Sequence, residues 1–200
     1  MAETSIDVTA LGHIATMGRR GRSSGAAGVT LSLIRGRACA MVIARAGQMQ
    51  QLARRVQEAY GVALPEGPGC AGVAVMFVGI GYGQWLALRA GSDDGAAFEI
   101  ELRAALAGCA SVSDQSDARV ALRAGGGRVR DMLAKLLPID LDERAFPPGS
   151  AASSLLGHIS ATVVRSDQSP TFEILVSRSY AESLWRAMVA AGAEYGIDIV

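Results

Sequence analysis

The sequence predicts an α+β fold made of two copies of a β-α-β-β-α unit. Two short strand-like runs, residues 40–47 and 118–125, both end in Arg-Ala-Gly. Each run is followed by a helix-like segment, a Leu/Pro-rich turn, two strand-like runs and a second amphipathic helix, and these second helices end alike at residues 102–108 and 185–192. Such repetition is typical of a duplicated supersecondary unit, here of about 70–80 residues. The element order is that of a ferredoxin-like unit, so we expect antiparallel sheets with helices on one face of each.

The first unit is predicted to cover residues 29–109. Alternating apolar and polar residues favour a strand over 29–34, and a second strand is expected over 39–44. Residues 48–60 carry apolar side chains at helical spacing. Gly61 follows directly, in the position where glycine commonly ends a helix. An amphipathic helix is therefore expected between the second strand and a Pro/Gly-rich loop.

The rest of the first unit is predicted to be a hairpin and a helix. Residues 73–78 are almost continuously apolar, which indicates a strand buried on both faces. Residues 85–89 are its expected hairpin partner, and the glycines of residues 79–83 make the turn. The polar residues 92–94 are suited to cap the helix expected over 96–107.

The second unit is predicted to cover residues 118–195, after a Ser/Asp-rich connector at 110–117. It opens with a strand over 118–122, and the glycines that follow turn the chain into a helix over 128–137. Pro138 ends that helix because proline cannot continue it. The two units are expected to pack together as one domain.

The second unit continues with a loop and a further pair of strands. Residues 139–150 contain two prolines and are predicted to be a loop, and strands are expected over 155–165 and 171–176. The last helix is expected to begin at Ser179. Glu182 lies three residues further on, so the two residues have the spacing of a capping box.

Residues 1–28 are predicted to be a flexible N-terminal arm. They are polar and rich in Gly, Ser and Arg, with a short ordered piece expected near 11–17. The arm contains the basic run Arg19-Arg20-Gly21-Arg22. This run is interpreted as a solvated tail, or alternatively as a tail that docks on an acidic partner.

The composition narrows the class of protein. Half of the 200 residues are hydrophobic and 19% are charged, which is typical of a globular chain whose apolar surface favours a subunit over a free monomer. The 19 basic and 19 acidic residues cancel, so no nucleic-acid partner is expected. The three cysteines lack C-x-x-C spacing, which argues against a disulfide framework and structural zinc. No signal peptide or apolar segment long enough to span a membrane is found, so a cytoplasmic protein is expected.

Two glycine-rich tracts are the candidates for phosphate binding. The glycines of residues 79–83 precede an apparent strand, whereas a dinucleotide fingerprint needs a helix there. Gly125-Gly126-Gly127 lies between a strand and a helix, so its amides are better placed for an anion. The equivalent turn of the first unit keeps only Gly47, and a tight turn is the favoured interpretation for both tracts.

Residues with catalytic chemistry are present but scattered. His13 and His158 lie in different elements and have no metal-ligand spacing. Ser153, His158 and Asp167 have the residue types of a triad, with nothing in the sequence to bring them together. The acidic residues of loop 140–143 are interpreted as solvated carboxylates rather than an acid/base pair. No catalytic, cofactor-binding or metal-binding residue is therefore predicted.

The second unit resembles the gamma subunit of heterotetrameric sarcosine oxidase. The resemblance covers about residues 118–193 and is looser in the first half, where Tyr82 replaces the proline of the family's Gly-Pro-x-x-Trp-Leu element. The residues that carry it are 120–125 (Val-Ala-Leu-Arg-Ala-Gly), 131–135 (Asp-Met-Leu-Ala-Lys), 138–141 (Pro-Ile-Asp-Leu), 145–149 (Ala-Phe-Pro-Pro-Gly), 155–159 (Leu-Leu-Gly-His-Ile), 171–176 (Thr-Phe-Glu-Ile-Leu-Val) and 178–185 (Arg-Ser-Tyr-Ala-Glu-Ser-Leu-Trp).

The resemblance implies a fold and a role. It implies the N-terminal part of the folate-binding aminomethyltransferase fold, in a non-catalytic subunit that supports assembly of a flavoprotein complex with alpha, beta and delta subunits. Such a complex demethylates sarcosine oxidatively, and the methyl carbon becomes formaldehyde or passes to tetrahydrofolate. FAD, FMN, NAD, zinc and tetrahydrofolate are implied on the other subunits, and no cofactor on this chain.

The partner interface is the one surface for which residues are predicted. Arg144, Phe146, Pro147 and Pro148 form a stiff, partly apolar loop, and Trp185 lies on the last helix. A phenylalanine beside two prolines loses little entropy on binding, so we expect loop 144–149 and the Trp185 helix to contact the alpha subunit. The alternative is that Phe146 packs internally.

Other functions remain open at this stage. A gamma-like subunit of a related N-methyl amino-acid dehydrogenase, such as N-methylglutamate dehydrogenase, fits the same motifs. A free-standing folate-binding or iron–sulfur-assembly protein of the same fold is the alternative of a different class, although the cysteine motif of the assembly type is absent. A structural protein without a complex is the third alternative.

Overall fold

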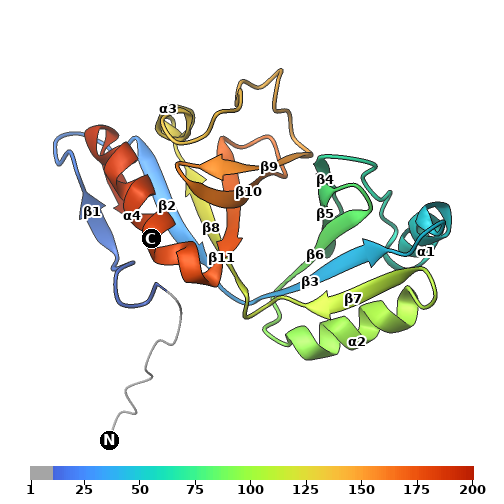
Figure 1. Cartoon of the computed structure of the whole chain (residues 1–200). Coiled ribbons are helices and arrows are strands. Elements are labelled where there is room, and N and C mark those ends of the chain that lie inside the picture. The colour runs from blue at the N-terminus through green and yellow to red at the C-terminus, as the bar shows by residue number, and fades with distance from the viewer. Residues whose placement is uncertain (1–10) are drawn as a thin grey trace, which may run out of the picture.

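Two β-sheets face each other, and helices cover their outer faces (Figure 1). The structure is a computed structural model that describes residues 11–200. Within those residues, no helix has the length and apolar character needed to cross a membrane. The predicted α+β class with antiparallel sheets is confirmed.

The five-stranded sheet is built from the first half of the chain and has the strand order β4-β5-β6-β3-β7. All of its pairings are antiparallel. Helices α1 (Met49–Tyr60) and α2 (Gly95–Ala105) pack on it. Its strands are β3 (Arg37–Ala44), β4 (Gly69–Ala71), β5 (Val75–Gly81), β6 (Gln84–Ala90) and β7 (Ala110–Asp114).

The seven-stranded sheet has the order β1-β12-β2-β8-β11-β10-β9. Its pairings are antiparallel except for β12 with β2. Helices α3 (Val129–Ala134) and α4 (Ala181–Gly192) pack on it, and the short 3-10 helices η1 (Arg178–Tyr180) and η2 (Ala193–Tyr195) flank α4. Its strands are β1 (Gly18–Arg20), β2 (Val29–Ile34), β8 (Arg119–Gly125), β9 (Ser150–Leu156), β10 (Ile159–Arg165), β11 (Thr171–Ser177) and β12 (Ile197–Ile199).

The duplication is visible in the strand orders. The order β4-β5-β6-β3-β7 in one sheet corresponds to β9-β10-β11-β8-β2-β12 in the other, with β2 inserted before the last strand. The first Arg-Ala-Gly directly follows β3, and the second forms the end of β8. Each unit also contains an additional strand before its hairpin, the three-residue β4 or the seven-residue β9, that the predicted β-α-β-β-α order lacks.

Three segments differ from the sequence-based expectations. Strand β2 was expected in the first unit but pairs with β8 and β12 in the seven-stranded sheet. The connector predicted at 110–117 begins with strand β7, which pairs with β3. The single strand expected over 155–165 is a hairpin, because the chain turns at Gly157, where φ is +64°.

The described part of the predicted arm is folded onto the rest of the chain. Leu11 is fully buried in the core that covers the seven-stranded sheet. Strand β1 pairs with β12, and Arg19 donates a hydrogen bond of 3.1 Å to Asp198. The ordered piece expected near 11–17 agrees with the buried Leu11. The expectation of a flexible arm is wrong for the basic run, because Arg19 and Arg20 lie in β1 at the edge of a sheet. Residues 1–10 lie outside the described residues.

Helix ends follow the predicted chemistry in the first unit but not in the last helix. Gly61 adopts the left-handed conformation after α1 and its amide donates to the Gln57 carbonyl, as expected. The capping box of Ser179 and Glu182 is absent because η1 precedes α4. Glu182 pairs instead with Arg186 one turn along the helix.

Asp94 caps α2, and its replacement is expected to cost about 1 kcal/mol of stability. Its side chain accepts a hydrogen bond of 2.8 Å from the Ala97 amide, which is otherwise one of the unpaired donors of the first turn. Urea unfolding of Asp94→Ala should show a lower midpoint at an unchanged slope. Asp93→Ala is the matched control, because Asp93 is its exposed neighbour outside the helix. Equal midpoints for the two variants would contradict the capping role.

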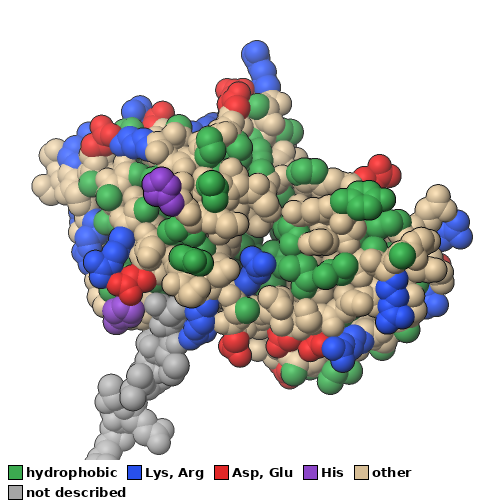
Figure 2. Space-filling model, in the orientation of Figure 1, with side chains coloured by type: hydrophobic (Ala, Val, Ile, Leu, Met, Phe, Trp, Pro, Cys, Tyr) green, Lys and Arg blue, Asp and Glu red, His purple; other side chains and the backbone are tan. Residues whose placement is uncertain are grey.

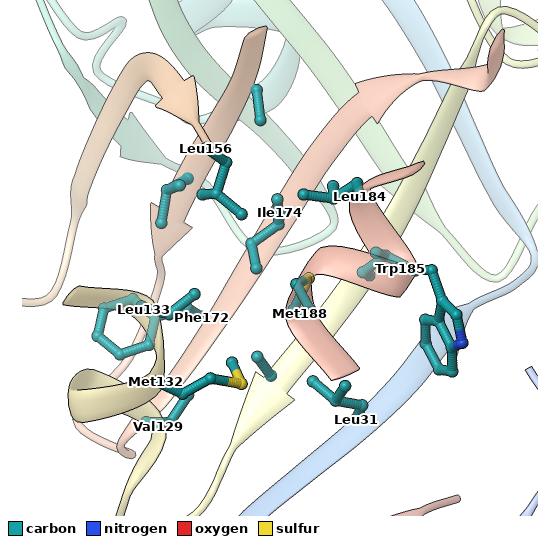
Figure 3. Packing of buried hydrophobic residues seen from close by; sticks show 14 of the residues in the cluster. Leu31, Val129, Met132, Leu133, Leu156, Phe172, Ile174, Leu184, Trp185 and Met188 are labelled. Carbon is teal, nitrogen blue, oxygen red and sulfur yellow. The ribbon is translucent and has the colours of Figure 1, made fainter. Parts of the chain in front are cut away.

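Two helix–sheet cores and one sheet–sheet core hold the fold together. Side chains of α3 and α4 point towards those of β2, β9 and β11 in the largest core (Figure 3). A second core lies between the five-stranded sheet and helices α1 and α2. The third core joins the inner faces of the two sheets, with Cys39, Val78, Leu86 and Leu88 on one side and Ala121, Ala151, Val164 and Leu175 on the other.

Candidate functional site

A buried carboxylate joins the two sheets at their inner faces. Glu173 on β11 is 6% exposed. Arg37, at the start of β3, donates to both of its oxygens, at 2.5 Å and 3.2 Å. Arg123 on β8 donates to Oε1 at 2.9 Å. This forked pairing fixes the start of the first repeated strand against the sheet of the second unit.

The arginines keep Glu173 ionised. Burial by itself raises the pKa of this carboxyl, because it disfavours the charged form. The hydrogen bonds and positive charges of Arg37 and Arg123 together outweigh burial, and the net effect is a lowered pKa. The cluster therefore holds a carboxylate and two guanidinium groups in place, which is a structural arrangement and not that of a general acid.

A second buried arginine holds the loop predicted to meet a partner. Arg165 on β10 is 1% exposed and donates to the Phe146 carbonyl at 2.8 Å. Its own carbonyl accepts from the Gly149 amide at 2.7 Å. Glu143, on the same loop, pairs with Arg165 and with Arg130. The loop is thus anchored at three points along its length.

The predicted interface residues differ in exposure. Phe146 is 6% exposed and packs against Phe172 with ring centroids 6.2 Å apart, and Trp185 is 3% exposed. Both are core residues of this chain, so neither side chain offers much surface to a partner. Arg144 and Pro147 are exposed and Pro148 is half-buried, so this part of the loop remains accessible.

Two large exposed side chains were missed by the sequence reasoning. Tyr82 is 90% exposed in the turn between β5 and β6. Val73 was expected to begin a strand buried on both faces, but β5 begins at Val75 and Val73 is 96% exposed. The available signal was a tyrosine flanked by glycines in a predicted hairpin turn. Surface apolar residues of this size are common at contact sites, although single ones are also normal.

Both glycine tracts serve close packing. A side chain at Gly79 would lie 2.1 Å from the Gly67 carbonyl oxygen, and one at Gly126, where φ is +104°, would lie 2.5 Å from the Gly28 carbonyl oxygen. Strand β6 follows the first tract, and the helix after the second, α3, has only six residues. Neither tract has the geometry of a nucleotide cradle.

The scattered polar residues have separate partners. The Ser153 hydroxyl oxygen lies 3.1 Å from that of Thr162, and Asp167 accepts a hydrogen bond from Ser169. His158 is exposed in the turn after β9.

In the acidic loop, Asp140 and Asp142 each accept a hydrogen bond from a backbone amide two residues further on. Within residues 11–200, no three His, Cys, Asp or Glu side chains are grouped so as to hold a metal ion.

Cys39 and Cys70 are protonated at neutral pH. Burial raises the pKa of Cys39 to about 12 and that of Cys70 to about 11. All three cysteines are free, and Cys109 is buried in the core of the first unit. A protonated, buried thiol is a poor nucleophile.

Comparisons with known proteins identify the family of the chain. No curated protein sequence matches the chain. The family model of the GCVT N-terminal domain matches residues 84–200, which is more than half of the chain. The chain belongs to this family. The match begins in the first unit and includes the whole of the second.

Two solved structures share the fold of this GCVT-domain protein. A chain of heterotetrameric sarcosine oxidase from Corynebacterium sp. U-96, in complex with pyrrole 2-carboxylate, matches with a TM-score of 0.76 and 24% identity over 88% of each chain. Glycine cleavage system aminomethyltransferase T from Bartonella henselae matches with a TM-score of 0.63 and 14% identity, over 86% of this chain and 47% of that one. The expected aminomethyltransferase-like fold is confirmed.

Proposed function

We propose that this GCVT-domain protein is the gamma-like subunit of a heterotetrameric sarcosine oxidase, with a structural role in assembly of the complex. The observation that carries the proposal is that the fold match extends over most of both chains. The chain and the sarcosine oxidase chain cover 88% of each other, whereas the chain spans under half of the aminomethyltransferase. A fold shared over nearly the whole length of the sarcosine oxidase chain supports a corresponding subunit role.

The chemistry of the described residues supports a structural role. The most deeply buried charges, Glu173, Arg37 and Arg165, hold sheets and loops together. A subunit of this kind supplies a preorganised surface to its partners. The exposed part of loop 144–149 and the Tyr82 turn are the surfaces with which we expect it to meet the alpha subunit.

The proposal extends to the other components. FAD, FMN, NAD, zinc and tetrahydrofolate are proposed to be bound by the alpha, beta and delta subunits, in the cytoplasm, and to carry out the oxidative demethylation of sarcosine there. A gamma-like subunit of an N-methyl amino-acid dehydrogenase fits equally, because substrate choice lies in the flavin-bearing subunit.

A free-standing folate-binding protein is the second candidate. The match to the GCVT N-terminal domain favours it, since that domain family includes the aminomethyltransferase fold. The fold match to the sarcosine oxidase chain, with a TM-score of 0.76 against 0.63 for the aminomethyltransferase, favours the subunit proposal over this candidate.

Co-expression with the alpha, beta and delta subunits of a sarcosine oxidase tests the proposal. The chain is expected to co-elute in size-exclusion chromatography with a yellow complex that oxidises sarcosine and produces peroxide. Co-expression with an unrelated flavoprotein is the control and should give a colourless chain that elutes alone. A well-folded chain that elutes alone in the presence of those subunits would contradict the proposal, and titration with tetrahydrofolate would then test the second candidate.

A further inference from the structure

A pocket of about 430 Å³ lies where the chain crosses between the two sheets. The connection from β2 to β3 and the connection from β7 to β8 pass side by side at this point (Figure 1). Residues 33–37, 116–117 and 119–121, at and beside these crossings, line the pocket. The volume is within the range of small-molecule sites, about 300–1,000 Å³.

The inner wall of the pocket is apolar and comes from both sheets. Leu33 and Leu175 belong to the seven-stranded sheet, and Leu88 and the buried Cys39 belong to the five-stranded sheet. The surface of the molecule is hollowed between its two lobes, and hydrophobic side chains gather there (Figure 2). An apolar wall of this kind favours a ligand with an apolar part.

The charged residues of the pocket carry a positive excess. Four arginines and two aspartates line it, namely Arg35, Arg37, Arg119, Arg178, Asp93 and Asp117. Glu173 pairs with both Arg37 and Arg123. One carboxylate therefore faces two guanidinium groups, and this cluster also keeps a net positive charge. Both aspartates are exposed, whereas Arg37 and Arg119 are half-buried. The potential is therefore more positive inside than at the mouth.

The hydrogen bonding of Arg119 is incomplete. Its Nε is buried and has no hydrogen-bond partner, and its guanidinium forms none of the ion pairs found within residues 11–200. A half-buried guanidinium without a carboxylate partner is costly, because its charge is partly removed from water. A bound oxyanion would supply the missing acceptor at its terminal nitrogens.

We propose that this pocket binds a small organic anion, with a carboxylate or phosphate group held by Arg119 and an apolar part against Leu33, Leu88 and Leu175. The site lies at the seam between the two repeated units. It gives a ligand-binding role to a chain whose proposed function is structural, and it does not depend on that function.

Isothermal titration of the full chain with four compounds at constant ionic strength tests the proposal. Benzoate and phenyl phosphate carry both the apolar part and the oxyanion, inorganic phosphate lacks the apolar part, and benzyl alcohol lacks the charge. Saturable binding is expected for benzoate or phenyl phosphate, more tightly than for inorganic phosphate, and the better of the two identifies the head group. If neither aromatic anion binds saturably, or if benzyl alcohol binds as tightly as they do, the proposal is wrong.

Variants locate the binding. Arg119→Gln removes the charge and is expected to weaken binding at least about tenfold, as for the loss of a charge-assisted hydrogen bond. Arg45→Gln is the matched control and should bind as the parent does, because exposed Arg45 follows the far end of β3, away from the pocket. Equal affinities for the two variants would place the binding elsewhere.

A third variant separates an effect on the binding site from an effect of misfolding. Asp117→Asn removes an exposed negative charge at the mouth of the pocket and is expected to tighten anion binding about two- to fivefold. Structural damage does not produce tighter binding. An unchanged or weaker affinity in this variant would overturn the proposed location.

Discussion

Glu173→Gln is expected to lower the free energy of unfolding by about 3 kcal/mol. The substitution keeps the size of the side chain but removes the charge that faces Arg37 and Arg123. Arg37 is 11% exposed, so its guanidinium would be left in the seam without a compensating charge. Chemical denaturation at neutral pH measures the effect as a lower midpoint.

The stability contributed by Glu173 also depends on pH. Its pKa is lower in the folded chain than the unfolded value of about 4.3, so the folded state favours the ionised form. The stabilisation is therefore fully present above the unfolded pKa and is lost as the pH falls through the folded pKa. Midpoints of parent and Glu173→Gln measured from neutral to acidic pH should converge in that window.

Two further variants separate the buried cluster from ion pairs in general. Glu182→Gln removes a carboxylate that also pairs with an arginine, Arg186, but is 43% exposed, so a loss below about 1 kcal/mol is expected. The double variant Arg37→Met/Glu173→Leu removes both buried charges and should recover much of the loss. A Glu173→Gln midpoint no lower than that of Glu182→Gln would show that the cluster does not hold the sheets.

The sequence predicts best those elements whose pattern lies within a few neighbouring residues. Helix α1 was predicted from its apolar spacing and from Gly61, and both are properties of neighbouring residues. The prediction missed β7 because the strand is short and its Ser/Asp content is typical of a connector, although its residues alternate between buried and exposed. Its place as a strand depends on pairing with β3. Strand β2 was assigned to the wrong sheet because only tertiary pairing with β8 and β12 decides its place.

The same limit applies to the functional residues. Glu173 and Arg37 are 136 residues apart, and no spacing rule connects them. The one signal was an acidic residue inside an otherwise apolar strand, which implies a buried partner because a lone buried carboxylate is unfavourable. The pocket at the chain crossing was likewise invisible in the sequence, since its walls come from both sheets.

Phe146→Ala is expected to destabilise the chain itself by about 3–4 kcal/mol. The ring is buried against Phe172, so its removal leaves a cavity in the largest core. The measurement is denaturant unfolding of the chain without partners. Pro147→Ala, at the exposed neighbouring position, is the control and should change stability by less than about 1 kcal/mol.

Co-purification with the partner subunits then separates a core role of Phe146 from an interface role. Because the ring faces inwards, Phe146→Ala should still co-elute with the complex at a temperature where the variant remains folded. Arg144→Ala and Pro147→Ala alter the exposed face of the same loop, and a contact there would weaken co-elution at unchanged stability. Loss of co-elution by folded Phe146→Ala, with both surface variants unaffected, would mean that Phe146 turns outwards in the complex. The buried position described here would then belong to the free chain alone.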